Sequence, residues 1–205
     1  NHQLQTLFLG YEQMENYSKV IGIFKDRAFD VINEGEMGQI ILEETAFYAE
    51  SGGQIGDVGS IVSKNGIFDV IDTQHSGNAQ VHIGSVSTGS ISLGDEVKVS
   101  INPIKRSAIT SNHTGTHLLH SALMKVLGEH VTQRGSLVDD MKIRFDFSHD
   151  QAVSSEQIRE IEPHVKSIGG IWVPCTGIID FRSTTSKLAE IAQAKNEKST
   201  IVLGE

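Results

Sequence analysis

The chain has 205 residues, of which 38% are hydrophobic and 21% are charged, and its formal net charge is −9. These proportions are typical of globular proteins, and the length suits one large domain or two small ones. The negative charge argues against nucleic-acid binding by bulk electrostatics, so we expect any such contact to be local. The candidate basic positions are Lys105 with Arg106, Arg134, and Lys142 with Arg144.

Composition also bears on the cellular compartment. No apolar run approaches the roughly 18 residues that a membrane helix needs, so no membrane partner is expected. The chain starts at Asn1 without a basic and then apolar leader, so we expect either an internal piece of a longer protein or a trimmed chain, without a signal peptide. A cytoplasmic location is the default expectation. A single cysteine, Cys175, rules out a framework of intrachain disulfides and suits a reducing compartment.

The first hundred residues contain short β-rich runs separated by glycine-containing turns. The predicted strands are Lys19–Phe24, Met37–Leu42, Gly59–Val62, Ile67–Ile71, Gln80–Ile83 and Glu96–Ile101. The predicted turns are Asn33–Gly35, Ser51–Gly53, Lys64–Gly66 and Ser76–Asn78. Asn65-Gly66 is the strongest hairpin signal among them. This pattern indicates a small antiparallel barrel or sandwich.

After Pro103 the pattern becomes helical. Apolar residues recur at helical spacing from Lys105 to Leu127, and Gly128 is a suitable C-cap. The elements predicted to follow are a hairpin of residues 136–138 and 142–147, a helix over 154–165 with an imperfect capping box, a strand and turn over 168–181, a helix over 186–198 and a strand over 200–203. We therefore predict two domains, residues 1–102 and 103–205.

His113 and His117 stand four residues apart on the predicted helix. Two imidazoles at this spacing point from one face and can share a metal ion, so a hydrolytic zinc site is the first hypothesis. The alternative is a pair of helix-face histidines without a metal. Thr114 occupies the position at which zinc peptidases carry their general-base glutamate, which argues against peptidase chemistry.

Seven separated segments together resemble the post-transfer editing region of alanyl-tRNA synthetase and its free-standing editing relatives. The segments are Phe8–Tyr11, Thr45–Asp57, Asp72–Gln74, Val81–Gly84, Asn112–His120, Gly128–Ser136 and Arg144–His149. They lie in the order found in that family, and the similarity extends over about residues 4–165. Several long motifs in order are more specific than an isolated pair of histidines.

The resemblance implies an α+β fold in which an antiparallel β-barrel precedes an α/β editing domain with a metal-binding helix. It also implies Zn²⁺ as the cofactor, held by the two helix histidines and a later Cys-x-x-x-His pair. The implied activity is hydrolysis of seryl- or glycyl-tRNA(Ala). The implied partners are the acceptor end of tRNA(Ala) and the remaining domains of a parent synthetase, an ATP-binding ligase of protein biosynthesis.

Carried over by position, the resemblance makes His113, His117 and Cys175 metal ligands. It makes Thr116 a polar residue that helps to select serine and places Gln133 in the catalytic pocket. The alternatives are that Thr116 packs on the helix and that Gln133 bonds to the backbone near Gly135. Ser51 lacks the histidine and acid of a nucleophile. The glycines after it are better explained by a turn with positive φ or by close packing against the other domain.

The chain departs from the family after Cys175. Ile179 stands where the histidine of the second pair is expected, and no histidine follows His164. Cys175 could supply a third ligand with water or another fourth group, the metal could be lost, or residues 166–205 could have a different origin. His120, His130 and His164 are weaker candidates as ligands, and we expect each to be solvated or satisfied. Competing readings are a catalytically inactive module of the same fold that binds tRNA or protein, and a generic metal hydrolase.

Overall fold

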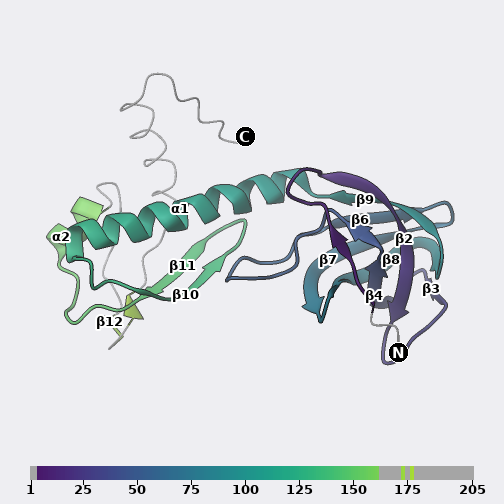
Figure 1. The fold of residues 1–205 in the computed structure, drawn as a ribbon, viewed down its shortest axis with the longest axis horizontal. Helices are drawn as coiled ribbons and strands as arrows, with labels where there is room; N and C mark the ends of the chain where they lie inside the picture. The colour runs from purple at the N-terminus through teal and green to yellow at the C-terminus, as the bar shows by residue number, and fades with distance from the viewer. Residues whose placement is uncertain (1–3, 162–171, 174–175, 178–205) are drawn as a thin grey trace, which may run out of the picture. The chain divides into compact units, whose positions relative to one another are not determined.

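The computed structural model describes residues 4–161, 172–173 and 176–177, and it divides into two compact units (Figure 1). Unit 1 comprises residues 1–51 and 55–106, and unit 2 comprises residues 52–54 and 107–205. The long helix α1 (Pro103–Leu127) starts in unit 1 and continues in unit 2. Residues 52–54 belong with unit 2 although both of their chain neighbours belong to unit 1.

Unit 1 is a closed barrel of six antiparallel strands. These strands are β2 (Glu15–Phe24), β4 (Met37–Leu42), β6 (Gly59–Ser63), β7 (Gly66–Ser76), β8 (Ala79–Ser92) and β9 (Glu96–Ile101). Their order is β8-β4-β2-β9-β6-β7, and the ring closes because β7 pairs with β8. The antiparallel barrel predicted from the sequence is therefore confirmed, and a sandwich is not formed.

Three short strands add to this barrel. Strand β3 (Val31–Asn33) pairs with the end of β8, whereas β1 (Leu7–Phe8) and β5 (Glu44–Thr45) form a separate parallel pair. Side chains alternate along the barrel strands between solvent and the interior, as in β2, where exposed and buried residues follow one another. The interior is filled by apolar side chains that include Ile23, Ile32, Ile40, Leu42, Phe47, Ile61, Phe68, Ile91 and Val99.

The hairpin at Asn65-Gly66 forms as predicted, but its glycine is needed for another reason. Gly66 does not have the positive φ that an Asn-Gly turn usually requires. The Ser63 hydroxyl instead accepts hydrogen bonds from the amides of Asn65 and Gly66, both at 3.1 Å. A Cβ at position 66 would lie 2.5 Å from the backbone nitrogen of Ser90. Close approach of β8 therefore excludes a larger side chain there.

His82 is completely buried in the barrel and is held in one tautomer. Its Nδ1 lies 2.9 Å from the Ile40 carbonyl oxygen, which can only accept, so Nδ1 donates. Nε2 then accepts a hydrogen bond from the Thr45 hydroxyl at 2.8 Å. Burial disfavours the charged ring and lowers the pKa of His82 to about 4, although its bond to Ile40 acts in the opposite direction.

We expect the barrel to lose about 2 kcal/mol of unfolding free energy between pH 7 and pH 5 through His82 alone. The unfolded chain takes up this proton near pH 6.5, whereas the folded barrel does so only at about pH 4. The contribution is therefore complete above pH 6.5 and is lost as the pH falls toward 4. Urea unfolding at both pH values checks this, because His82→Gln should flatten this part of the pH dependence. An equal pH dependence in both proteins would contradict it.

Unit 2 packs α1 on an antiparallel hairpin of β10 (Gln133–Val138) and β11 (Ile143–Phe147). Helix α2 (Ser155–Ile161) and the short strands β12 (Trp172–Val173) and β13 (Thr176–Gly177) follow, and β12 and β13 pair with each other. The core contains Leu119, Leu123, Val131, Ile143, Phe145, Phe147 and Ile161. The two helices and the single barrel among the described residues make the fold α+β, in agreement with the predicted class.

Local signals correctly predicted the end of α1 and the cap at the start of α2, whereas β10 starts three residues before the predicted strand 136–138. Helix α1 ends at Leu127, and Gly128 follows it with a φ of 116°. At the start of α2, the Ser154 amide donates to Gln157 Oε1 at 2.8 Å, and the Gln157 amide donates to Ser154 Oγ at 3.2 Å. These two bonds complete a capping box. The predicted elements over 186–198 and 200–203 lie outside the described residues.

Within the described part of the chain, neither helix combines the length and apolar character needed to cross a bilayer.

Candidate functional site

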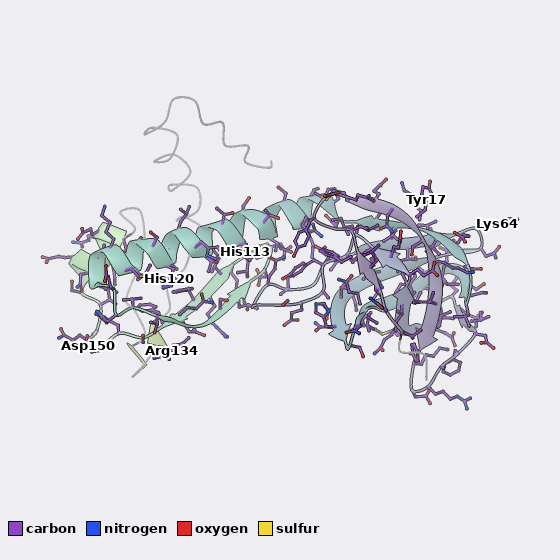
Figure 2. The ribbon with its side chains drawn as sticks, in the orientation of Figure 1. Tyr17, Lys64, His113, His120, Arg134 and Asp150 are labelled. Atoms are coloured by element: carbon purple, nitrogen blue, oxygen red, sulfur yellow. The ribbon has the colours of Figure 1, made fainter. Side chains whose placement is uncertain are left out.

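The two histidines at the predicted metal-binding spacing lie side by side on the exposed face of α1. The ring centroids of His113 and His117 are 5.1 Å apart, with the ring planes tilted by 42°. Both residues are exposed, and Figure 2 shows His113 near the middle of α1. The helix therefore places the two imidazoles where one ion could contact both.

Residues 52–54, which also belong to unit 2, contact this pair although Gln54 precedes His113 by 59 positions in the sequence. Gln54 Oε1 lies 2.7 Å from His113 Nδ1. Because a carbonyl oxygen can only accept, Nδ1 carries the proton and Nε2 keeps a free lone pair. Metal-ligating histidines are commonly oriented by such a bond at their other nitrogen. The residues present therefore fit a zinc ion bound through His113 Nε2.

The segment that carries Gln54 is fixed to β10 by backbone hydrogen bonds. The Val138 amide donates to the Gly53 carbonyl at 2.7 Å, and Gln54 forms a parallel bridge with Val138. The Ser136 hydroxyl donates to the Gly52 carbonyl at 3.2 Å. Gly52 and Gly53 have φ values of 62° and 88°, so the first of the two explanations predicted for these glycines, a turn with positive φ, is confirmed.

We expect Gly53→Ala to destabilise unit 2 by about 1–3 kcal/mol more than Gly52→Ala does. Both substitutions carry the strain of a positive φ. A Cβ at Gly53 would lie 2.3 Å from the Ser136 carbonyl oxygen, whereas a Cβ at Gly52 would have no neighbour within 4 Å. The two variants should therefore differ only by the clash with β10. Denaturant unfolding measures the difference, and equal stabilities would contradict the docked position of this segment.

Gln133 and Thr116, the two predicted pocket residues, differ in their surroundings. Gln133 Nε2 donates to Ser136 Oγ at 3.1 Å. The same hydroxyl donates to the Gly52 carbonyl, so Ser136 links Gln133 to residues 52–54, called the docked segment below. The alternative in which Gln133 bonds to backbone near Gly135 is not what the structure shows. Thr116 is buried, and its hydroxyl donates to the Asn112 carbonyl at 3.0 Å. Thr116 therefore packs on its own helix, and its part in selecting serine stays a prediction.

A comparison with protein families bears on the barrel. The family model described as tRNA synthetases class II (A) matches residues 1–105, just over half of the chain. The chain belongs to the class II (A) tRNA synthetases. It is therefore related to the ligases that charge tRNA in protein biosynthesis. An interaction with tRNA is consistent with this family. The match ends before His113, so it rests on the barrel and not on the candidate site.

The other candidate ligands of this synthetase-family chain are Cys175, His120, His130 and His164. Cys175, Ile179 and His164 lie outside those residues, so the prediction for Cys175 stands as a prediction. His120 Nε2 lies 3.4 Å from the Val131 carbonyl oxygen, and its ring packs against Phe145 with centroids 5.2 Å apart. His120 is therefore a satisfied histidine, as expected.

Of the candidate basic positions, Arg106 is not a surface charge. Its guanidinium forms a buried ion pair with Asp57 within unit 1. Arg134 and Lys142 are exposed in unit 2, and Arg144 lies 3.2 Å from Asp146. The register of β10 against β11 skips Arg134, which makes it the extra residue of a β-bulge next to Gln133. Figure 2 shows Arg134 on the hairpin. Arg134 and Lys142 are therefore the exposed basic side chains that the hairpin offers to a local contact.

Proposed function

We propose that this chain is the editing region of an alanyl-tRNA synthetase and that unit 2 hydrolyses the ester of seryl- or glycyl-tRNA(Ala). The observation that carries the proposal is the exposed pair of His113 and His117, with Gln54 orienting His113 at 2.7 Å. The synthetase family of the barrel and the ordered motifs over about residues 4–165 support the same activity.

In this proposal His113, His117 and Cys175 hold Zn²⁺. When bound, zinc supplies a Lewis acid that polarises the ester carbonyl or positions a water beside it. Gln54 keeps the proton of His113 on Nδ1, so that the ring presents Nε2. Three protein ligands and an open position are typical of a catalytic zinc centre.

The hairpin supplies the polar groups of the proposed pocket. Gln133 Nε2 donates its hydrogen bond to Ser136 Oγ. The amide oxygen of Gln133 is then the acceptor for the ammonium or hydroxyl group of the aminoacyl moiety. In this proposal the exposed Arg134 and Lys142 contact phosphates near the acceptor end. A local contact of this kind is what a chain of net charge −9 can offer to tRNA.

The second candidate is a module that keeps the fold and binds tRNA or protein without hydrolysis. It is favoured by Ile179, which stands where the family carries a metal-binding histidine. Under this alternative the chain holds no zinc at His113 and His117, and their exposed face binds no substrate.

Zinc content and seryl-tRNA(Ala) deacylation by the purified chain test the proposal together. The assay should use the protein in excess over the charged tRNA, so that weak binding of an isolated piece does not hide the chemical step. Zinc with hydrolysis is the expected result. Absence of both would establish the inactive module instead. Alanyl-tRNA(Ala) is the control substrate and should be hydrolysed more slowly.

A further inference from the structure

A second group of metal-binding side chains lies in unit 2, at the end of the hairpin where β11 stops. His130 is in the loop that follows α1, and His149 and Asp150 follow β11 after Ser148. Figure 2 shows Asp150 toward the end of unit 2 where α1 ends, whereas His113 lies near the middle of α1. The proposed editing reaction uses none of these three residues.

The three donor atoms are close enough to share one ion. His130 Nε2 lies 2.8 Å from His149 Nδ1, and Asp150 Oδ1 lies 4.0 Å from the first and 3.7 Å from the second. The point equidistant from these atoms lies about 2.1 Å from each, which is within the range of zinc bonds to histidine nitrogen and carboxylate oxygen. Only the angle between the two nitrogens is narrow, and a small separation of the rings would widen it.

The surrounding loops hold the donors in place. The Ser148 amide donates to the Thr132 carbonyl at 3.0 Å, and the Thr132 amide donates to the Ser148 hydroxyl at 3.2 Å. These bonds connect the segment after α1 with the end of β11. A Cβ at Gly128 would lie 2.9 Å from His130 Nδ1, so the glycine makes room for the ring. The side chain of His149 is only 12% exposed.

We propose that His130, His149 and Asp150 form a second metal site, which takes a zinc-like divalent cation and ties the loop after α1 to the end of β11. Two imidazoles with one carboxylate are donors that suit zinc and its transition-metal neighbours, whereas Mg²⁺ and Ca²⁺ prefer oxygen donors. On binding, the ring that donates the hydrogen bond between the histidines takes its proton on its outer nitrogen. Both inner nitrogens would then be unprotonated and able to bind the ion.

Zinc binding by the full chain tests this site separately from the proposed editing centre. The starting variant carries His113→Ala with His117→Ala, which removes the other pair of histidines. Bound Zn²⁺ is then measured by calorimetric titration and elemental analysis at neutral pH. Further variants in this background are His130→Ala with His149→Ala, Asp150→Asn, and His75→Ala as the control, since His75 is an exposed histidine of unit 1.

We expect the starting variant to bind one zinc ion per chain. His130→Ala with His149→Ala should abolish that binding, Asp150→Asn should weaken it by about tenfold or more, and His75→Ala should leave it unchanged. Circular dichroism of all variants should coincide, because the changed side chains lie at the surface or at its edge. A starting variant that binds no zinc, or one that binds it equally well after loss of His130 and His149, would overturn the inference. Loss of hydrolysis with this zinc retained would concern the editing centre alone.

Discussion

A chain carrying both His113→Ala and His117→Ala is expected to lose one equivalent of zinc and at least about 100-fold of its rate of seryl-tRNA(Ala) hydrolysis, because a metal Lewis acid contributes several kcal/mol and each 1.36 kcal/mol is tenfold. Both rings lie on the exposed face of α1, so their removal leaves the apolar contacts of the helix intact. Single-turnover deacylation and elemental analysis are the measurements.

The matched control for this variant is His75→Ala, which removes an exposed imidazole from β7 in unit 1. It should leave both the zinc content and the hydrolysis rate unchanged. Hydrolysis at the wild-type rate by the double histidine variant would show that the chemistry lies elsewhere. Unchanged zinc content would show that these two residues are not the ligands.

Gln54→Leu should weaken zinc binding at the same site without abolishing it. This change keeps the size of the side chain and removes the acceptor that orients His113, so zinc affinity should fall by about 10–100-fold. Gln151→Leu, at an exposed glutamine of unit 2, is the control and should have no effect. Competition with a chromophoric chelator measures both affinities. Equal affinities would mean that the contact between Gln54 and His113 does not support a metal.

Asp57→Ala is expected to lower the unfolding free energy of the barrel by about 3–5 kcal/mol, because it leaves the guanidinium of Arg106 buried without its counter-charge. The two side chains are 3% and 13% exposed. Arg106 also donates to the carbonyl oxygens of Gly10 at 2.8 Å and Ala46 at 3.1 Å. The Tyr48 amide donates to the Asp57 carboxylate at 2.8 Å. Asp57 thus neutralises Arg106 and anchors the strand-free segment that follows β5.

Urea unfolding followed by near-ultraviolet circular dichroism of tyrosine measures this loss, since all three tyrosines, Tyr11, Tyr17 and Tyr48, belong to unit 1. Adding Arg106→Met to Asp57→Ala should recover part of the stability, because no buried charge then remains. Glu15→Ala removes the exposed partner of Lys98 and should have little effect. A small loss with Asp57→Ala would contradict the view that this pair is buried and essential.

The sequence by itself determined several local elements of both units, although β1, β3 and β5 were not predicted and β8 (Ala79–Ser92) extends well beyond the predicted strand Gln80–Ile83. Strands β4 and β9 have the bounds that their apolar runs predicted, and α1 stops at the predicted Gly128. These features depend on side-chain periodicity and on residues that only certain backbone conformations accept, both of which are readable over a few neighbours. The spacing of His113 and His117 is local in the same sense, because one helix turn sets it.

Only the tertiary structure decided which distant residues meet. Gln54 contacts His113, which lies 59 positions later in the sequence. Asp57 forms an ion pair with Arg106, although the sequence analysis had named Arg106 as a candidate for nucleic-acid contact. His130 in the loop after α1 met His149 and Asp150 after β11. No periodicity encodes these contacts, because they depend on how the docked segment, the hairpin and the helix pack. The contacts of the candidate site therefore depend on long-range packing, whereas many of the secondary-structure elements depend on local sequence.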